Sequence, residues 1–101
     1  MIKINIEKNN TRIISLEVSG HSNYDEKGKD IVCAAISALT TSFINSADLY
    51  DCGVQIIDNE HGLISLLFTK HSIELNILLN SYLMAVSGIA NQYPEHVEVV
   101  F

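Results

Sequence analysis

The chain has little cysteine, little proline and little charge. Its 101 residues include two cysteines and one proline, and 18% are charged while 48% are hydrophobic. Two cysteines are too few for a disulfide framework, and a chain this apolar buries a core instead of remaining disordered. The length suits one domain, which we expect to span residues 1–101, with a core modest enough that a partner would help it.

Positive charge is scarcer still. Six Lys and Arg residues stand against twelve Asp and Glu, which gives a net charge of −6, and the basic residues are scattered. No basic stripe is available to neutralise phosphates, so we do not expect direct binding to nucleic acid. No two Cys or His residues have close metal-ligand spacing, so we expect no metal and no other cofactor.

The sequence also lacks an export signal. The N-terminal residues MIKINIEK contain no apolar signal-peptide core, so we expect a reducing, cytoplasmic setting. Residues 75–94 carry no charge, but polar residues such as Asn76, Asn80 and Gln92 interrupt the segment at a high cost in hydrocarbon. We therefore expect a buried helix there and not a membrane span.

Hydrophobic periodicity predicts an α+β fold in a single domain, with the order β-β-α-β-β-α-β. Two helices packed on one sheet are the simplest way to bury both apolar helix stripes. The expected elements are strands at 2–6 and 14–18, a helix from Asp30 to Gly53, strands at 54–57 and 63–68 with a loop at 58–62 between them, a helix from Ser72 to Pro94, and a strand at 96–101.

Each expected helix has an apolar stripe. The first stripe runs from Val32 to Tyr50, and the second from Leu75 to Ala90. Leu83 and Met84 fall outside the second stripe, which hints at self-association through that helix.

The segment from Gly20 to Ser37, GHSNYDEKGKDIVCAAIS, is where chemistry is most expected. Asp30 is a preferred N-cap residue, and with Asp30 as the cap Cys33 becomes the third helical position. Free N–H groups and the helix dipole stabilise an anion there, which lowers a thiol's pKa and offers donors to an oxyanion. Val32 lies on the buried stripe, so Cys33 is expected at the edge of the core, with Ser37 one turn further on.

His21 is the candidate general base for Cys33. It lies where the second strand ends, and a strand end and the next helix start commonly meet at one sheet edge. Gly20 allows an unusual backbone angle that aims the imidazole, and Gly28 allows the loop to flex. Plainer interpretations remain open, because a cysteine beside two alanines is often a small buried hydrophobe and a histidine after glycine is often a loop residue.

The other cysteine and histidines are expected to be structural or solvated. Cys52 lies near a helix end with no basic partner. His61 is expected to be solvated in a turn, His71 before the second helix, and His96 on a strand surface.

The pair Gly20-His21, followed by Gly28-Lys29-Asp30-Ile31-Val32-Cys33-Ala34-Ala35-Ile36-Ser37, closely resembles the motif of the ribosomal-processing cysteine protease family called Prp. Length and element order agree over essentially the whole chain. Alanine often follows the histidine in that family, and here the residue is Ser22. The resemblance implies homodimeric bacterial endopeptidases that remove a short N-terminal extension, after paired aromatic residues, from large ribosomal subunit protein twenty-seven.

By motif position, the resemblance implies that His21 is the general base and Cys33 the nucleophile. Asp30 and Ser37 take the motif's acidic and hydroxyl positions, and Gly20 and Gly28 its glycines. We expect Asp30 first to cap the helix, and the loop 22–29 to act as a gate over the substrate.

Two other classes of function compete with the protease. One is a non-catalytic dimeric module that binds ribosomal protein without cutting it. The other is a thiol redox protein, which the absence of a C-x-x-C motif and the sequence distance between Cys33 and Cys52 disfavour.

Overall fold

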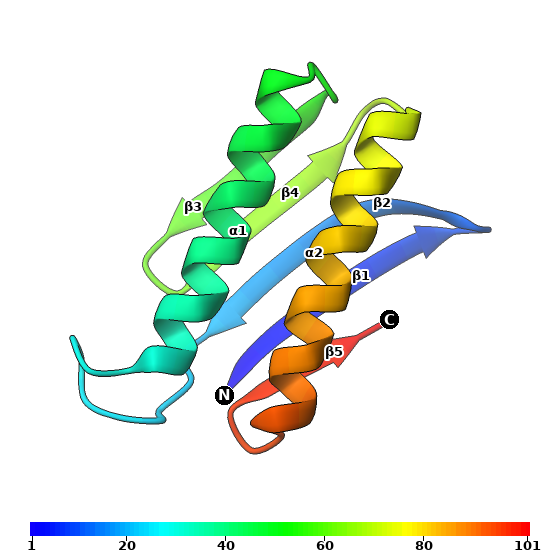
Figure 1. The fold of residues 1–101 in the computed structure, drawn as a ribbon. Coiled ribbons are helices and arrows are strands. Elements are labelled where there is room, and N and C mark those ends of the chain that lie inside the picture. The colour runs from blue at the N-terminus through cyan, green and yellow to red at the C-terminus, as the bar shows by residue number, and fades with distance from the viewer.

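Both expected hairpins form, and their four strands join the C-terminal strand in one five-stranded sheet (Figure 1). The computed structural model describes residues 1–101. Its elements are β1 (Ile2–Asn9), β2 (Arg12–Gly20), α1 (Ile31–Leu49), β3 (Val54–Glu60), β4 (Leu63–Phe68), α2 (Ile73–Gln92) and β5 (Val97–Val100). The strand order is β3-β4-β2-β1-β5, antiparallel throughout except for the parallel pair β1 and β5. The expected α+β fold and element order are confirmed.

The strand β3 is longer than its sequence pattern predicts. It continues to Glu60, so the connection to β4 is the two-residue turn His61-Gly62 and not a five-residue loop. The alternation breaks because the register with β4 shifts between Ile56 and Asp58, and such a bulge places consecutive residues on the same side of the strand. This shift ends the apolar pattern at Ile57 although the strand goes on.

Both helices cover the same face of the sheet, side by side (Figure 1). One core of 17 buried residues lies between the two layers, with Ile4, Ala47 and Val86 fully enclosed. Two details of the expected stripes are wrong. Leu83 is buried in the core, and Tyr50 lies beyond the end of α1 with 58% of its surface exposed.

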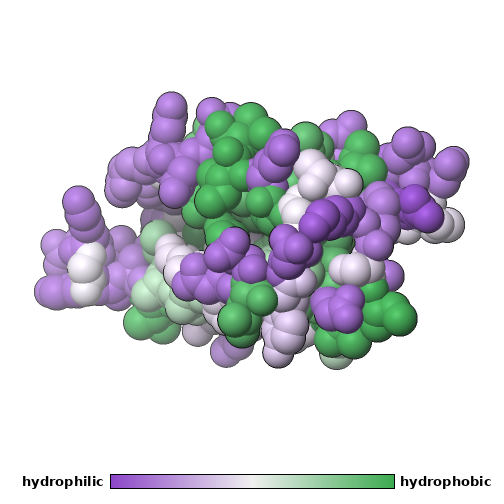
Figure 2. Space-filling model, turned by 90° about the horizontal axis from the view of Figure 1, so that it is seen from above, coloured by the Kyte–Doolittle hydropathy of each residue, from purple (hydrophilic) through white to green (hydrophobic).

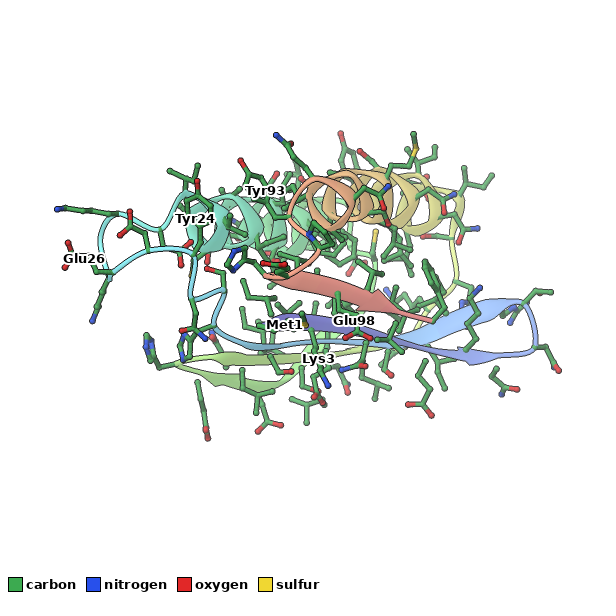
Figure 3. All side chains as sticks on the ribbon, turned by 90° about the horizontal axis from the view of Figure 1, so that it is seen from below. Met1, Lys3, Tyr24, Glu26, Tyr93 and Glu98 are labelled. Atoms are coloured by element: carbon green, nitrogen blue, oxygen red, sulfur yellow. The ribbon has the colours of Figure 1, made fainter.

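The opposite face of the sheet is open to solvent. Exposed side chains of β1 and β5, including Lys3 and Glu98, lie there, and these two residues are partners in the parallel register (Figure 3). Seen from above, hydrophilic residues cover the left and right ends of the molecule, and apolar residues gather in its upper middle and along its lower edge (Figure 2).

Both α1 and α2 are long and apolar enough to cross a membrane, by length and composition alone. The core helices of proteins without membrane spans pass the same test. Here each helix buries one apolar side against the sheet and the other helix, with Val32, Ile36 and Phe43 buried on α1 and Leu75, Leu79 and Val86 on α2. This packing is the arrangement expected from the sequence in place of a membrane span.

The topology brings three chain segments together at one end of the molecule. The start of α1, the end of β2 and the turn between β3 and β4 all lie at the lower left of Figure 1. The pairing of Ser19 with Leu63 forces the last two to meet, because it sets the residues after Ser19 beside those before Leu63.

Candidate active site

The N-cap of α1 places Cys33 in the first helical turn, as expected. Asp30 has extended backbone angles, and its Oδ1 accepts a hydrogen bond of 2.8 Å from the Cys33 N–H. The Cys33 thiol is half-buried at the edge of the core, beside the fully buried Val32. A thiol in this position lies near the positive end of the helix dipole, which favours the thiolate.

The second carboxylate oxygen of Asp30 holds the loop that precedes the helix. It accepts hydrogen bonds from the hydroxyl of buried Ser22 and, at 3.2 Å, from the Tyr24 N–H. Desolvation acts to raise the pKa of Asp30, but the bonds from Cys33, Ser22 and Tyr24 outweigh it and hold that pKa below its usual range. Both oxygens are committed to the cap and the loop, so Asp30 does not orient His21.

The His21 side chain follows a turn that only glycine allows. Gly20 has a φ of +90°, and a Cβ at this position would collide with the Met1 carbonyl oxygen. The Gly20 N–H donates a 2.9 Å hydrogen bond to the Gly62 carbonyl, which ties the end of β2 to the β3–β4 turn. His21 is therefore held at the sheet edge below the start of α1.

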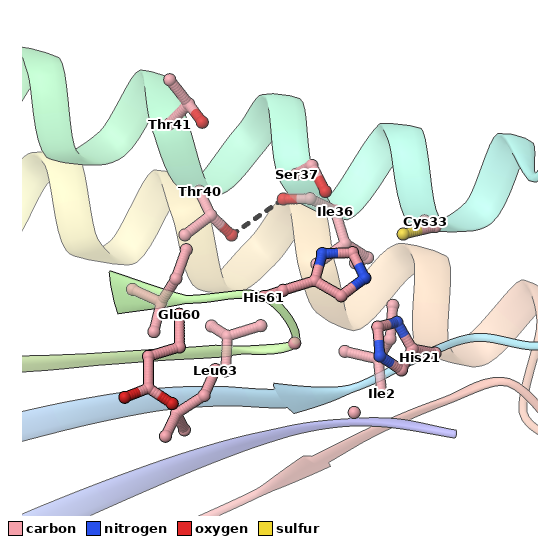
Figure 4. Close-up of a pocket in the computed structure, with 14 residues that line it drawn as sticks. Ile2, His21, Cys33, Ile36, Ser37, Thr40, Thr41, Glu60, His61 and Leu63 are labelled. Carbon is pink, nitrogen blue, oxygen red and sulfur yellow. Dashed lines mark hydrogen bonds between the residues drawn. The ribbon is translucent and has the colours of Figure 1, made fainter. Parts of the chain in front are cut away.

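His21 and Cys33 line the same two cavities, and Figure 4 shows the first of them. A cavity of about 230 Å³, the apolar cavity, lies between α1 and the sheet, with Ile36, Leu63 and Ile64 among its walls. A second of about 470 Å³, the loop cavity, lies beneath the loop that leads into α1. Four residues line both cavities and form the ridge between them: His21, Cys33, Ser37 and His61.

Figure 4 shows both imidazoles on the sheet side of the cavity, below the Cys33 sulfur. No hydrogen bond joins His21 and Cys33, and the dashed line in Figure 4 is the bond from Thr40 Oγ1 to the Ile36 carbonyl. Catalytic contacts are often long in ligand-free enzymes and tighten when substrate binds.

The remaining expected site residues lie around the ridge. Ser37 is exposed one turn beyond Cys33, and Gly28 lines the loop cavity with a φ of +90°. Cys52 is 1% exposed beyond the C-terminal end of α1, and both cysteines are free thiols.

Two histidines make contacts that the sequence does not predict. His61 is exposed in a turn, as expected, but its ring also packs against that of His21 with the centroids 5.0 Å apart. His96 precedes β5, and its Nδ1 bonds the Ser22 carbonyl at 2.8 Å, so that it anchors the residue after His21. Because a carbonyl only accepts, Nδ1 carries the proton. Neither contact has a local sequence signal, since both follow from strand register.

Tyr24 adds a further anchor to the loop. Its ring meets Tyr93 and His96 edge-on, at centroid distances of 5.4 and 5.3 Å. Figure 3 shows Tyr24 beside Tyr93, with Glu26 at the outer tip of the same loop. The loop is thus fixed at its base and projects at its tip, where Lys29 and Glu26 form an exposed ion pair of 3.1 Å.

A half-buried thiol at a helix N-terminus, with imidazoles and an apolar cavity beside it, is the arrangement by which cysteine peptidases attack a peptide carbonyl. The chain is similar over nearly all of its length to proteins of this class. The family model described as "Cysteine protease Prp" matches residues 1–98, and the chain belongs to that family.

Two curated relatives carry the same description, "Ribosomal processing cysteine protease Prp". The Mycoplasma genitalium protein is 33% identical over 100 residues, which cover 98% of this chain and 94% of that protein. The Bacillus subtilis protein is 36% identical over 47 residues, which cover 46% of this chain and 42% of that protein. The chain is therefore a cysteine-type peptidase of a family devoted to ribosomal processing.

Solved structures share the fold. The essential ribosomal processing protease Prp from S. aureus, in complex with a covalently linked product peptide, has a TM-score of 0.85 and 23% identity, with 99% of this chain and 98% of that chain covered. SMU.848 from Streptococcus mutans has a TM-score of 0.79 and 25% identity, with 99% and 92% covered. A second S. aureus Prp structure, with a substrate peptide, has a TM-score of 0.77 and 22% identity over 98% and 97% of the two chains.

Proposed function

We propose that the protein is a cysteine endopeptidase that removes the N-terminal extension of large ribosomal subunit protein twenty-seven, with Cys33 as nucleophile and His21 as general base. The observation that carries the proposal is that a thiol at the start of α1 and the imidazole at the end of β2 line the same cavities. We further propose that residues 1–101 form one catalytic domain, which acts as a cytoplasmic homodimer without direct contact to nucleic acid.

The proposed reaction begins with transfer of the Cys33 proton to His21. The sulfur attacks the scissile carbonyl carbon, and the tetrahedral oxyanion forms near the start of α1. The Cys33 N–H is already bound to Asp30, so the donors to the oxyanion are the first-turn N–H groups of Ile31 and Val32, which have no intrahelical acceptor.

The tetrahedral intermediate then breaks its C–N bond, and the His21 imidazolium protonates the leaving amine. The N-terminal fragment stays on Cys33 as a thioester. Water, deprotonated by His21, attacks this thioester, releases the fragment as a carboxylic acid and restores the thiol. Asp30 supports the reaction by capping α1, and Ser37 lies on the ridge where its hydroxyl reaches the substrate backbone.

The two cavities suit the two sides of such a cut. The apolar cavity matches an aromatic side chain before the scissile bond, as in the paired aromatic residues that the family resemblance implies. The loop cavity has Asp25, Lys27 and Asp30 in its lining and matches the polar chain on the other side. A net charge of −6 favours a basic ribosomal protein as partner. The S. aureus relative has been solved with substrate and product peptides.

The test is cleavage of the extended ribosomal protein, followed by mass spectrometry, with Cys33→Ala and His21→Ala as variants and Cys52→Ala as the matched thiol control. We expect one new cut near the N-terminus, which disappears in the first two variants and persists in Cys52→Ala. Tight binding of the substrate without any cut would contradict the proposal and favour a non-catalytic module that docks on ribosomal protein.

A further inference from the structure

The turn between β3 and β4 lies against the proposed base. Gly62 faces the His21 ring so closely that a Cβ on Gly62 would lie 2.9 Å from Nε2 and 3.2 Å from Cε1. The neighbouring His61 ring meets the same imidazole at a centroid distance of 5.0 Å and an interplanar angle of 40°. The hydrogen bond from Gly20 to the Gly62 carbonyl fixes this turn to the residue that precedes His21.

His21 has no acidic partner to orient it. Asp30, the nearest candidate in the motif, gives one oxygen to Cys33 N–H and the other to Ser22 and Tyr24. His21 is itself exposed, so its ring is free to rotate wherever the protein does not pack against it. The His61-Gly62 turn packs against the ring and restricts this rotation.

We propose that His61 is a positioning residue that holds the His21 imidazole in the orientation facing Cys33. The inference rests on the proposed function and assigns to an aromatic contact the task that an aspartate or asparagine performs in a catalytic triad. A tilted ring pair restricts rotation of its members, and a base held in its productive orientation reacts in a larger fraction of encounters. The position of His61 on the ridge, between the two cavities, places this contact where the substrate crosses.

The test separates the ring of His61 from its nitrogens. His61→Phe keeps an aromatic ring on His21, and His61→Ala removes it. Each is made in the native chain and in the His21→Ala background. His71→Ala serves as the matched control, because it removes an exposed histidine that lies outside both cavities. Two readouts are taken: kcat and KM for the extended peptide, and the rate of iodoacetamide alkylation at Cys33, read by peptide mass spectrometry.

We expect His61→Ala to lower kcat about tenfold while KM changes less than about twofold, since only the placement of the base is lost. His61→Phe should stay within about threefold of the native kcat, and His71→Ala should match the native protein. In the His21→Ala background, which is not expected to cut, His61→Ala should leave the alkylation rate of Cys33 unchanged, because His61 acts through His21. Alkylation should follow the same order as kcat. His61 is exposed, so we expect these variants to fold, and a thermal melt of each confirms it.

Four results would overturn the inference: a native kcat in His61→Ala, a kcat for His61→Phe as low as that of His61→Ala, a raised KM at constant kcat, or a further fall in the alkylation rate of Cys33 when His61→Ala is added to His21→Ala. If the native protein cuts no peptide, the proposed function is wrong. The positioning role of His61 is then tested by the alkylation rate of Cys33 alone. A Cys33 labelling rate that drops in both His21→Ala and His61→Ala but not in His61→Phe supports positioning. A rate indifferent to either histidine refutes it.

Discussion

A buried hydrogen bond between α1 and α2 allows a direct test of how the two helices stabilise each other. Thr40 is 1% exposed and Tyr82 4%, and their hydroxyl oxygens are 2.7 Å apart. The single Thr40 hydroxyl proton goes to the Ile36 carbonyl at 2.8 Å, so Tyr82 donates to Thr40. Burial raises the pKa of Tyr82, against the opposing effect of the Thr40 bond, and keeps the phenol protonated as a donor.

The magnitudes follow from which group is left unpaired. Tyr82→Phe removes a donor and leaves Thr40 bonded to Ile36, so we expect a loss of about 1 kcal/mol in the free energy of unfolding. Thr40→Val removes the acceptor and leaves a buried phenol O–H with none, which costs about 2 to 3 kcal/mol. In the double variant both groups are apolar and of similar shape. We therefore expect its free energy of unfolding to be about 1 kcal/mol higher than that of Thr40→Val alone.

Urea unfolding of the four proteins, followed by circular dichroism, measures these differences. About 1 kcal/mol corresponds to roughly 4–8 °C in Tm for a domain of this size, so thermal melts show the same order. The decisive result is that Tyr82→Phe stabilises the Thr40→Val protein although it destabilises the native one. Additive losses in the double variant would refute the reasoning, because they would show that Tyr82 does not depend on Thr40.

Two further predictions concern the site. Gly62→Ala places a Cβ against His21 at a φ of +82°, so we expect kcat for the peptide to fall by more than about tenfold. The control is Gly53→Ala, which has a φ of +69° and places its Cβ against Lys70 and Thr69. It should lose stability to the same strain without that loss of kcat. Equal kcat values in the two variants would contradict the prediction. The lowered pKa of Asp30 means that its ionised form stabilises the fold above the ordinary pKa of about 3.9, and that this contribution is lost as the pH falls through the folded value. The difference in unfolding free energy between the native protein and Asp30→Asn should therefore be constant above about pH 5 and shrink below pH 4, and a difference independent of pH would exclude this role for Asp30.

Local sequence signals predict the parts of the site that depend on neighbours along the chain. Asp30 caps α1 and sets Cys33 at its third residue, because an N-cap acts on the amide three positions on. Gly20 has the left-handed backbone that its position before His21 suggests. The alternation of apolar and polar residues in β1 and β2 predicts these two strands and the face that each buries.

Contacts that depend on strand register are beyond those signals. The bulge after Ile56 interrupts the apolar pattern, so the sequence does not predict that β3 continues to Glu60. The sequence therefore places His61 in a five-residue loop, whereas the structure has it in a two-residue turn. That turn meets His21 only because Leu63 pairs with Ser19. Leu83 is missed for a different reason: it lies one turn after Leu79 on the buried side of α2, and that side is wider than the single stripe taken from the sequence.

The most direct test of the central claim is to trap the covalent intermediate. The protein is mixed with the extended peptide, quenched in acid within milliseconds to seconds, and analysed by intact and peptide mass spectrometry. The account predicts a thioester on Cys33 with the mass of the N-terminal fragment as a free acid less one water, absent in Cys33→Ala. Cleavage that persists in Cys33→Ala, or an adduct on any other residue, would contradict it.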